Sequence, residues 1–205
     1  DIVLVSCNGS STAIQDGINY IRNYANSVGK PSVINLSWGT NIGPHDGTST
    51  FDQFCDDNLE DGHILVGSVG NTGDTKQVTH TNSSYDNFFT CLSENNCTNR
   101  SIDIWGAVGS SFGVALNIYD AGDQEFEAYT AYFYPSNNGF GGNTSYDDVL
   151  YDDDTWMPDA LDYTVFTEIN SENGKPHAKI YINNSYQDDN DKYIMIDIVN
   201  CTGTE

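Results

Sequence analysis

Residues 33–39 read Val-Ile-Asn-Leu-Ser-Trp-Gly, and residues 64–73 read Ile-Leu-Val-Gly-Ser-Val-Gly-Asn-Thr-Gly. Each stretch begins as a short apolar run, of the kind that is buried on both faces of a parallel sheet, and ends in small and polar residues. Residues 2–6 form a third apolar run. Helical patterns separate the three runs, and this alternation indicates right-handed crossovers and a parallel sheet. We expect strands at residues 2–6, 33–36 and 64–68.

The two helical patterns have recognisable ends. In the first, apolar residues recur at helical spacing and form one stripe: Ile14, Ile18, Ile21, Ala25 and Val28. Thr12 is the expected N-cap, Gln15 can complete a capping box, and Gly29 with Pro31 ends the helix. The second helix is expected from about residue 50 to residue 59, with Ser49 or Thr50 as its N-cap.

The loop between these elements contains Gly-Pro-His-Asp-Gly-Thr-Ser-Thr at residues 43–50. His45, Asp46 and Ser49 are the residue types of a serine-nucleophile triad, but they are too close in the chain for the imidazole to sit between nucleophile and carboxylate. Asp46-Gly47 is a turn dipeptide, and Ser49 opens a helix. We interpret this stretch as a turn and a helix start.

From about residue 76 the apolar period changes to two, which is typical of strands with one buried face. The alternating positions fall in five groups, namely 102/104, 114/116/118, 163/165, 178/180/182 and 194/196/198, and turns such as Asn173-Gly174 separate them. This pattern predicts an antiparallel sandwich, plausibly jelly-roll-like. Its aromatic residues fill the core or one sheet face, or else form a carbohydrate platform: Trp105, Tyr129, Tyr132, Phe133 and Tyr134.

Charge limits the classes of partner. The 205 residues include 7 Lys and Arg against 30 Asp and Glu, a net charge of −23. Such a surface repels phosphate backbones and anionic lipid, so we expect neither nucleic-acid nor membrane binding. The sequence contains no run of 18 apolar residues that could span a membrane.

Metal and disulfide signals are weak. Five cysteines form no complete framework and no Cys-x-x-Cys pair, and we expect Cys7 and Cys55 to be buried free thiols. Cys91 and Cys97 could bridge a short loop. Acidic runs at residues 147–148, 152–154 and 188–191 could chelate calcium, but none has calcium-loop spacing. We expect no cofactor, with calcium as the alternative.

Ligands of open parallel sheets bind in the crevice beyond the carboxyl ends of the strands. The stretch Gly70-Asn71-Thr72-Gly73 follows one strand at such an end. It can present the Asn71 amide into the crevice, or it can be a plain turn, since Asn and Gly are turn residues.

The order strand, helix, VINLSWG, helix, ILVGSVGNTGD resembles the middle of a subtilisin-like serine peptidase, of the subtilase or S8 family. In that family the two quoted segments form opposite walls of the substrate cleft, and the asparagine side chain of the second donates to the oxyanion. The resemblance implies that Asn71 is the oxyanion-hole donor and that six residues line the cleft: Ser37, Trp38, Gly39, Ser68, Val69 and Gly70. Trp38 is larger than the leucine common at its position.

Residues 101–105 and 112–114 resemble part of a β-sandwich that some bacterial subtilases insert before their nucleophile, including Bacteroides-type and clostridial Csp-like members. The expected fold is α/β. A partial parallel three-layer subtilisin-like sheet in residues 1–75 is followed by an antiparallel, jelly-roll-like β-sandwich insertion in residues 76–205.

The family's catalytic residues occur as D-(S/T)-G, H-G-T-H and G-T-S-M-A, and this sequence contains none of these motifs. The resemblance therefore implies a fragment of a secreted or cell-surface bacterial endopeptidase, inactive alone. Its partners would be a peptide or protein substrate and the remainder of the peptidase chain. Two alternatives are a fragment of a non-catalytic subtilase-like pseudopeptidase and a β-sandwich binding or adhesion module.

Overall fold

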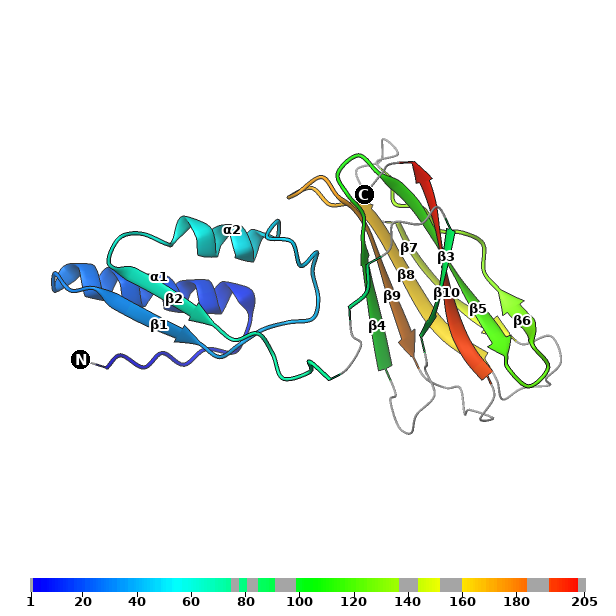
Figure 1. The fold of residues 1–205 in the computed structure, drawn as a ribbon, viewed down its shortest axis with the longest axis horizontal. Coiled ribbons are helices and arrows are strands. Elements are labelled where there is room, and N and C mark those ends of the chain that lie inside the picture. The colour runs from blue at the N-terminus through cyan, green and yellow to red at the C-terminus, as the bar shows by residue number, and fades with distance from the viewer. Residues whose placement is uncertain are drawn as a thin grey trace. The chain divides into compact units, whose positions relative to one another are not determined.

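The structure is a computed structural model that describes residues 2–74, 78–80, 85–90, 99–136, 144–151, 160–183 and 192–202. Its internal contacts divide the chain into two compact units, Asp1–Thr79 and His80–Glu205. Figure 1 labels the helices and strands of both. We describe each unit by itself. That residues 76–205 are an insertion domain stays a prediction.

The first unit contains α1 (Ser11–Ser27), β1 (Ser32–Leu36), α2 (Thr50–Asp57) and β2 (His63–Gly67). β1 and β2 pair in parallel, from Ser32 opposite His63 to Leu36 opposite Gly67. The predicted parallel pairing is confirmed for these two strands. Their shared core joins both helices to one face of the sheet: Ile14, Ile18 and Ile34, with Ile21, Leu36, Trp38, Phe51, Phe54 and Leu65 partly buried around them.

The prediction of a strand at residues 2–6 is wrong, because this segment has no strand pairing in the structure. Ile2 and Leu4 are 90% and 91% exposed, while Val5 lies against Gly17 of α1. The segment contacts the helix and does not pair with the edge of β1. A strand of a parallel sheet is stabilised when both of its faces are buried. An apolar run whose side chains stay exposed lacks this stabilisation and need not pair.

The helix caps differ in one case from the prediction. Ser10, not Thr12, caps α1, and its Oγ accepts a hydrogen bond from the Ala13 amide at 3.3 Å. Ser49 caps α2: its Oγ accepts from the Asp52 amide at 3.1 Å and donates to the Asp52 carboxylate at 2.6 Å. Ser49 therefore has a structural partner.

The rest of the 43–50 loop is confirmed as a turn. The Asp46 carboxylate accepts from the backbone amide of Thr48 at 3.1 Å and from its hydroxyl at 2.6 Å. The His45 ring contacts the carbonyl of Asn41 at 3.1 Å. His45, Asp46 and Ser49 thus bond to separate partners and form no triad.

We expect Ser49→Ala to destabilise α2 by about 1 kcal/mol, because the substitution removes an N-cap acceptor. Local opening of α2 then becomes about fivefold more frequent, which hydrogen exchange of its amides measures. Thr50→Ala is the matched control, since the Thr50 side chain is not the cap. Equal exchange in the two variants would contradict the assignment of Ser49.

The second unit contains eight described strands: β3 (Tyr85–Thr90), β4 (Asn99–Trp105), β5 (Ser111–Asp120), β6 (Glu125–Tyr129), β7 (Thr144–Tyr151), β8 (Ala160–Ile169), β9 (Pro176–Asn183) and β10 (Lys192–Thr202). They form two four-stranded sheets, ordered β3-β10-β5-β6 and β4-β9-β8-β7. Every pairing between these strands is antiparallel. Period-two alternation thus predicted five of these strands, β4, β5, β8, β9 and β10, and the antiparallel pairing, but it missed β3, β6 and β7.

The two sheets share one core. Alternate residues of β5, β8, β9 and β10 supply most of it, including Val114, Leu116, Val165, Ile180 and Ile196. Most of the aromatic residues that the sequence analysis named lie outside this core. Of the five named from the sequence, Phe133 packs against this core, but Tyr129, Tyr132 and Tyr134 are exposed. The expectation of a place in the core is therefore wrong for these three, which lie on and beyond an edge strand, and the alternatives of a sheet face or a carbohydrate platform stay predictions.

Candidate functional site

The two predicted cleft segments lie side by side where β1 and β2 end. Leu36 and Gly67 are the last register partners, and the Ser68 amide donates to the Leu36 carbonyl at 3.1 Å. The hydroxyl of the same Ser68 donates to the Trp38 carbonyl at 3.2 Å. The structure thus brings residues 37–39 together with residues 68–70, as parallel pairing requires.

The two sides of the first segment have different surroundings. The Trp38 ring is half-buried and packs against Phe51 of α2, with ring centroids 5.4 Å apart. Ser37 is exposed, and its Oγ accepts a hydrogen bond from the side-chain Nδ2 of Asn35 at 3.2 Å. The indole thereby anchors the segment to the core, and the exposed backbone at Ser37 and Gly39 is available to a ligand.

The second segment is exposed throughout. Ser68, Val69, Gly70 and Asn71 all lie at the surface, and Val69 is fully exposed. Gly70 has a φ of +87°, a conformation that favours glycine, so the chain turns sharply just before Asn71. Among the described residues, the Asn71 side chain has no hydrogen-bond partner. Its amide can therefore donate to a ligand at the carboxyl end of β2.

A different polar contact lies at the opposite end of the same strands. The Ser32 hydroxyl lies 2.7 Å from His63 Nδ1, and His63 Nε2 lies 3.0 Å from the Asn26 side-chain oxygen. The arrangement resembles a nucleophile with its base, but the orienting group is an amide and the serine contacts Nδ1. A serine triad uses Nε2 for the nucleophile and a carboxylate at Nδ1. We interpret this contact as structural, joining α1 to the starts of β1 and β2.

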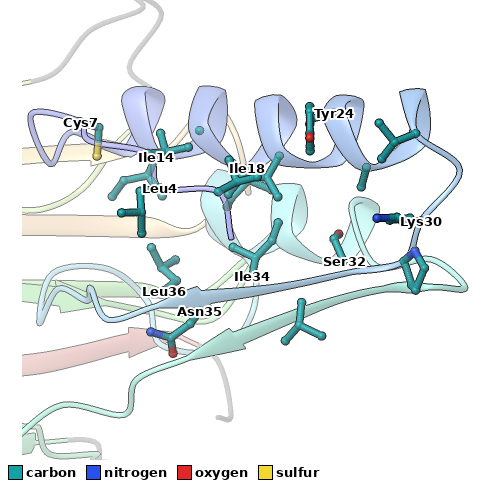
Figure 2. Close-up of a pocket in the computed structure, with 18 of the residues that line it drawn as sticks. Leu4, Cys7, Ile14, Ile18, Tyr24, Lys30, Ser32, Ile34, Asn35 and Leu36 are labelled. Carbon is teal, nitrogen blue, oxygen red and sulfur yellow. The ribbon is translucent and has the colours of Figure 1, made fainter. Parts of the chain in front are cut away.

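A cavity of about 490 Å³ lies between α1, β1 and the N-terminal segment (Figure 2). Its lining is mainly apolar and includes Leu4, Cys7, Ile14, Ile18 and Ile34. None of the predicted site residues lines it. The cavity therefore belongs to the packing of α1 on β1, where residues 2–6 leave the sheet edge uncovered.

The comparisons with known proteins decide the family. Residues 2–145, well over half of the chain, match the family model described as "Subtilase family". The chain belongs to the subtilase family. Among solved structures, the subtilase chain is similar to the structure of the Clostridium perfringens CspB protease, with a TM-score of 0.54 and 14% sequence identity. A comparison with curated proteins finds no match.

The similarity to the CspB protease concerns the fold, because the identity is low. It covers 97% of this chain and 40% of that chain. The subtilase chain therefore spans less than half the length of this relative. The role of Asn71 and the cleft-lining roles of Ser37, Trp38, Gly39, Ser68, Val69 and Gly70 stay predictions.

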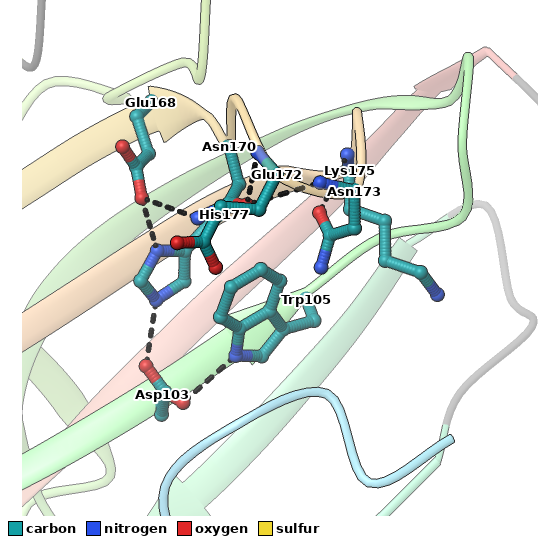
Figure 3. A network of polar contacts seen from close by, with 8 residues as sticks. All are labelled: Asp103, Trp105, Glu168, Asn170, Glu172, Asn173, Lys175 and His177. Atoms are coloured by element: carbon teal, nitrogen blue, oxygen red, sulfur yellow. Dashed lines mark hydrogen bonds and ion pairs between the residues drawn. The ribbon is translucent and has the colours of Figure 1, made fainter. Parts of the chain in front are cut away.

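The second unit of the subtilase chain holds a buried histidine between two carboxylates (Figure 3). His177 Nε2 lies 2.7 Å from an Asp103 oxygen and Nδ1 lies 3.1 Å from a Glu168 oxygen. Trp105 stacks on the imidazole at 3.9 Å and donates to Asp103 at 2.7 Å. A carboxylate at each nitrogen favours the doubly protonated, cationic form of the imidazole.

Burial would lower the pKa of His177, but hydrogen bonds from the imidazole to Asp103 and Glu168 outweigh it and raise the pKa. His177 lies near the start of β9, and spacing along the sequence does not reveal its partners. The partners come from other strands: Glu168 and Trp105 are the register neighbours of His177. Only the strand register could have identified this cluster.

Metal and thiol predictions have limited outcomes. Within the described parts of the chain, no group of three or more His, Cys, Asp or Glu side chains could hold a metal ion. The acidic runs at residues 152–154 and 188–191 lie outside the described residues, as do Cys91 and Cys97. Cys7 and Cys55 are free thiols, but the expected burial is wrong, since Cys7 is exposed and Cys55 half-buried. No described helix is long and apolar enough to cross a membrane.

Proposed function

We propose that this chain supplies the oxyanion donor and both substrate-binding walls of a subtilisin-like serine endopeptidase. The observation that carries the proposal is the exposed Asn71 amide, which follows the left-handed Gly70 at the carboxyl end of β2 in a subtilase-family chain. Ligands of open parallel sheets bind in the crevice beyond the carboxyl ends of the strands.

The reaction would be acyl transfer. A serine attacks the scissile carbonyl, a histidine moves the proton, and the developing negative charge collects on the carbonyl oxygen. Asn71 Nδ2 donates a hydrogen bond to that oxygen. Such a donor is effective when it is in place before the charge develops, because no reorganisation is then needed as the reaction proceeds.

The substrate is a polypeptide in extended conformation. The backbone at Ser37 and Gly39 is exposed beside that of Ser68 and Gly70. Main-chain groups at such strand ends can pair with an extended peptide, while side-chain pockets select its sequence. The half-buried Trp38 packs against Phe51 and so anchors the first wall to the core.

The serine, histidine and aspartate of the triad would come from the remainder of the peptidase. Their motifs do not occur in this sequence, and the chain spans 40% of the CspB protease chain. A second observation supports a further partner segment. The face of β1 and β2 opposite the helices carries Val33, Ile64 and Val66, which are 69%, 55% and 47% exposed. A parallel sheet is ordinarily covered on both faces, so a third layer would bury them.

In this proposal the two antiparallel sheets of the second unit form a jelly-roll-like insertion domain that restricts the substrate or stabilises the enzyme. The net charge of −23 favours a soluble location, and we assign the parent protein to the secreted or cell-surface class. A pseudopeptidase that binds peptides without cutting them is the second candidate, since it would keep the same walls. The sequence of the parent protein distinguishes the two, because only a peptidase requires all three triad motifs.

We expect the 205-residue chain alone to hydrolyse no peptide, because it contains none of the triad motifs. The measurement is cleavage of a fluorogenic peptide library, with the full-length protein as the positive control. Activity that remains with the purified chain and resists serine-reactive inhibitors would contradict the proposal. Activity of the full-length protein that these inhibitors abolish would exclude the pseudopeptidase.

A further inference from the structure

We propose that the free side of β6, with the segment that continues it, binds an extended polypeptide rich in lysine or arginine. We call residues 125–134 the aromatic edge. Four exposed aromatic side chains lie along it: Phe126, Tyr129, Tyr132 and Tyr134. The proposal does not depend on the role of Asn71.

The aromatic edge consists of β6, a five-residue edge strand, and the segment that follows it. β6 ends its sheet and, among the described strands, pairs with β5 alone (Figure 1). The chain stays beside β5 after Tyr129. The Thr130 amide donates to the Leu116 carbonyl at 2.9 Å, and Phe133 and Val114 exchange two backbone hydrogen bonds of 2.8 and 2.9 Å. One side of this segment is therefore fixed, and the other is a template on which a further strand can pair.

The exposed aromatic side chains of this edge favour association with a partner. Proteins usually protect an edge strand with lysine, proline or a charged side chain that points inward. Here Phe126 and Tyr129 are 54% and 76% exposed, and residues 101–174 contain no lysine or arginine at all. The Phe126 ring lies 5.2 Å from that of Tyr119, and the rings of Tyr132 and Tyr134 are 6.3 Å apart. Glu125 and a β-bulge opposite β6 protect this edge only in part, because four aromatic rings stay exposed along it, and exposed rings of this kind indicate a partner.

Charge selects the partner. Asp123 and Glu125 are exposed at the hairpin that leads into the aromatic edge, and Asp120 is half-buried there. Among the described residues, strand pairing places one basic residue beside this hairpin, Lys192, the register partner of Asp120. A second copy of the chain would bring the same net charge of −23 and be repelled. A cationic peptide is attracted instead.

The same peptide would satisfy all three features of the surface. Its backbone adds a strand to the β6 edge, as in β-strand addition. Its lysine or arginine side chains lie over the exposed rings in cation–π contacts, worth about 0.5–1 kcal/mol each at such sites. Asp123 and Glu125 hold the remaining cations. A neutral oligosaccharide would stack on the rings but would use neither the strand edge nor the acidic residues.

The test uses the whole chain and fluorescent peptides in which valine alternates with lysine or, in the control peptide, with glutamate. Anisotropy titrations at low and high salt measure affinity. The variant Phe126→Ser with Tyr129→Ser removes two rings, and Tyr181→Ser removes an exposed ring from β9 of the other sheet. We expect the lysine peptide to bind more weakly at high salt. We expect the double variant to lose about tenfold in affinity and Tyr181→Ser to lose none.

Several results would overturn the proposal. They are equal affinity for the glutamate peptide, undiminished affinity of the double variant, and self-association that the double variant abolishes. Saturable binding of a neutral oligosaccharide that displaces the lysine peptide would also overturn it. Circular dichroism of each variant establishes that the sheets are intact, since both replaced side chains are exposed and their loss leaves the core unchanged.

Discussion

If Asn71 is the proposed oxyanion donor, we expect its replacement by alanine in the full-length protein to lower kcat by about 10²–10³ and to leave KM nearly unchanged. This magnitude is the loss of kcat known for removal of an oxyanion donor in a subtilisin, and we expect the same loss here. The split between kcat and KM has a physical reason. The amide bonds to charge that exists only in the transition state, so its loss does not weaken substrate binding.

Two further variants sharpen this experiment. Asn71→Asp keeps the size of the side chain but replaces a donor with an acceptor, so we expect a loss of kcat at least as large. Asn23→Ala removes an exposed asparagine from α1 and is expected to leave kcat unchanged. A normal kcat in Asn71→Ala would refute the oxyanion assignment. A raised KM with normal kcat would make Asn71 a binding residue only.

The second unit loses stability as the pH rises, because His177 is buried as a cation between Asp103 and Glu168. Its pKa in the folded protein is raised above the usual value near 6.5. The stabilising contribution of His177 is therefore complete below that usual pKa, where both folded and unfolded states bind the proton. It declines as the pH rises through the higher pKa of the folded state.

Asp103→Asn tests this cluster by removing one of the two charges that hold the imidazolium. Breaking a buried ion pair by removing one partner costs about 3–5 kcal/mol, and the remaining Glu168 contact places this variant at the lower end. Urea unfolding from pH 5 to pH 9 measures both effects, followed by tryptophan fluorescence in a Trp38→Phe, Trp156→Phe background that leaves Trp105 as the reporter. We expect Asp103→Asn to be less stable at low pH and to have a flatter pH profile.

Asp123→Asn is the matched control, since it removes an exposed carboxylate from a different hairpin of the same unit. It should change neither the stability at low pH nor the profile. An Asp103→Asn variant whose stability still falls with pH as steeply as the wild type would show that other groups cause the dependence. A wild type whose stability rises over this pH range would contradict the sign.

The sequence predicted those elements whose signals are local. Period-two alternation identified β4, β5, β8, β9 and β10 of the second unit, since one face of each of these strands enters or packs against the shared core. The apolar runs at 33–36 and 64–68 located β1 and β2 to within a residue. Ser49 was predicted as a cap because a helix start needs an acceptor for its first amides.

Other features depend on contacts between distant parts of the chain. Residues 2–6 have the composition of a strand, but pairing depends on what covers them, and Ile2 and Leu4 are exposed. The ion pairs of His177 join β4, β8 and β9, and no spacing within one segment reveals that register. Tyr129 is typical of a core aromatic residue by composition, yet β6 is an edge strand.

The candidate site could be predicted from the sequence only in part. Its two segments could be found from sequence because they resemble the cleft segments of the subtilase family, and strand ends in a parallel sheet meet at one edge. That the Trp38 indole packs on Phe51, while Asn71 is exposed, required the structure. The position of the reacting serine relative to Asn71 depends on the remainder of the peptidase.

The most direct test of the central claim is a crystal structure of the full-length protein inhibited by a peptide boronate. The boronate forms a tetrahedral adduct with the catalytic serine and carries an oxygen where the oxyanion develops. We predict that Asn71 Nδ2 lies within about 3 Å of that oxygen, with the peptide between residues 37–39 and 68–70. An adduct whose oxygen is held by other groups, with the Asn71 amide turned to solvent, would contradict the account.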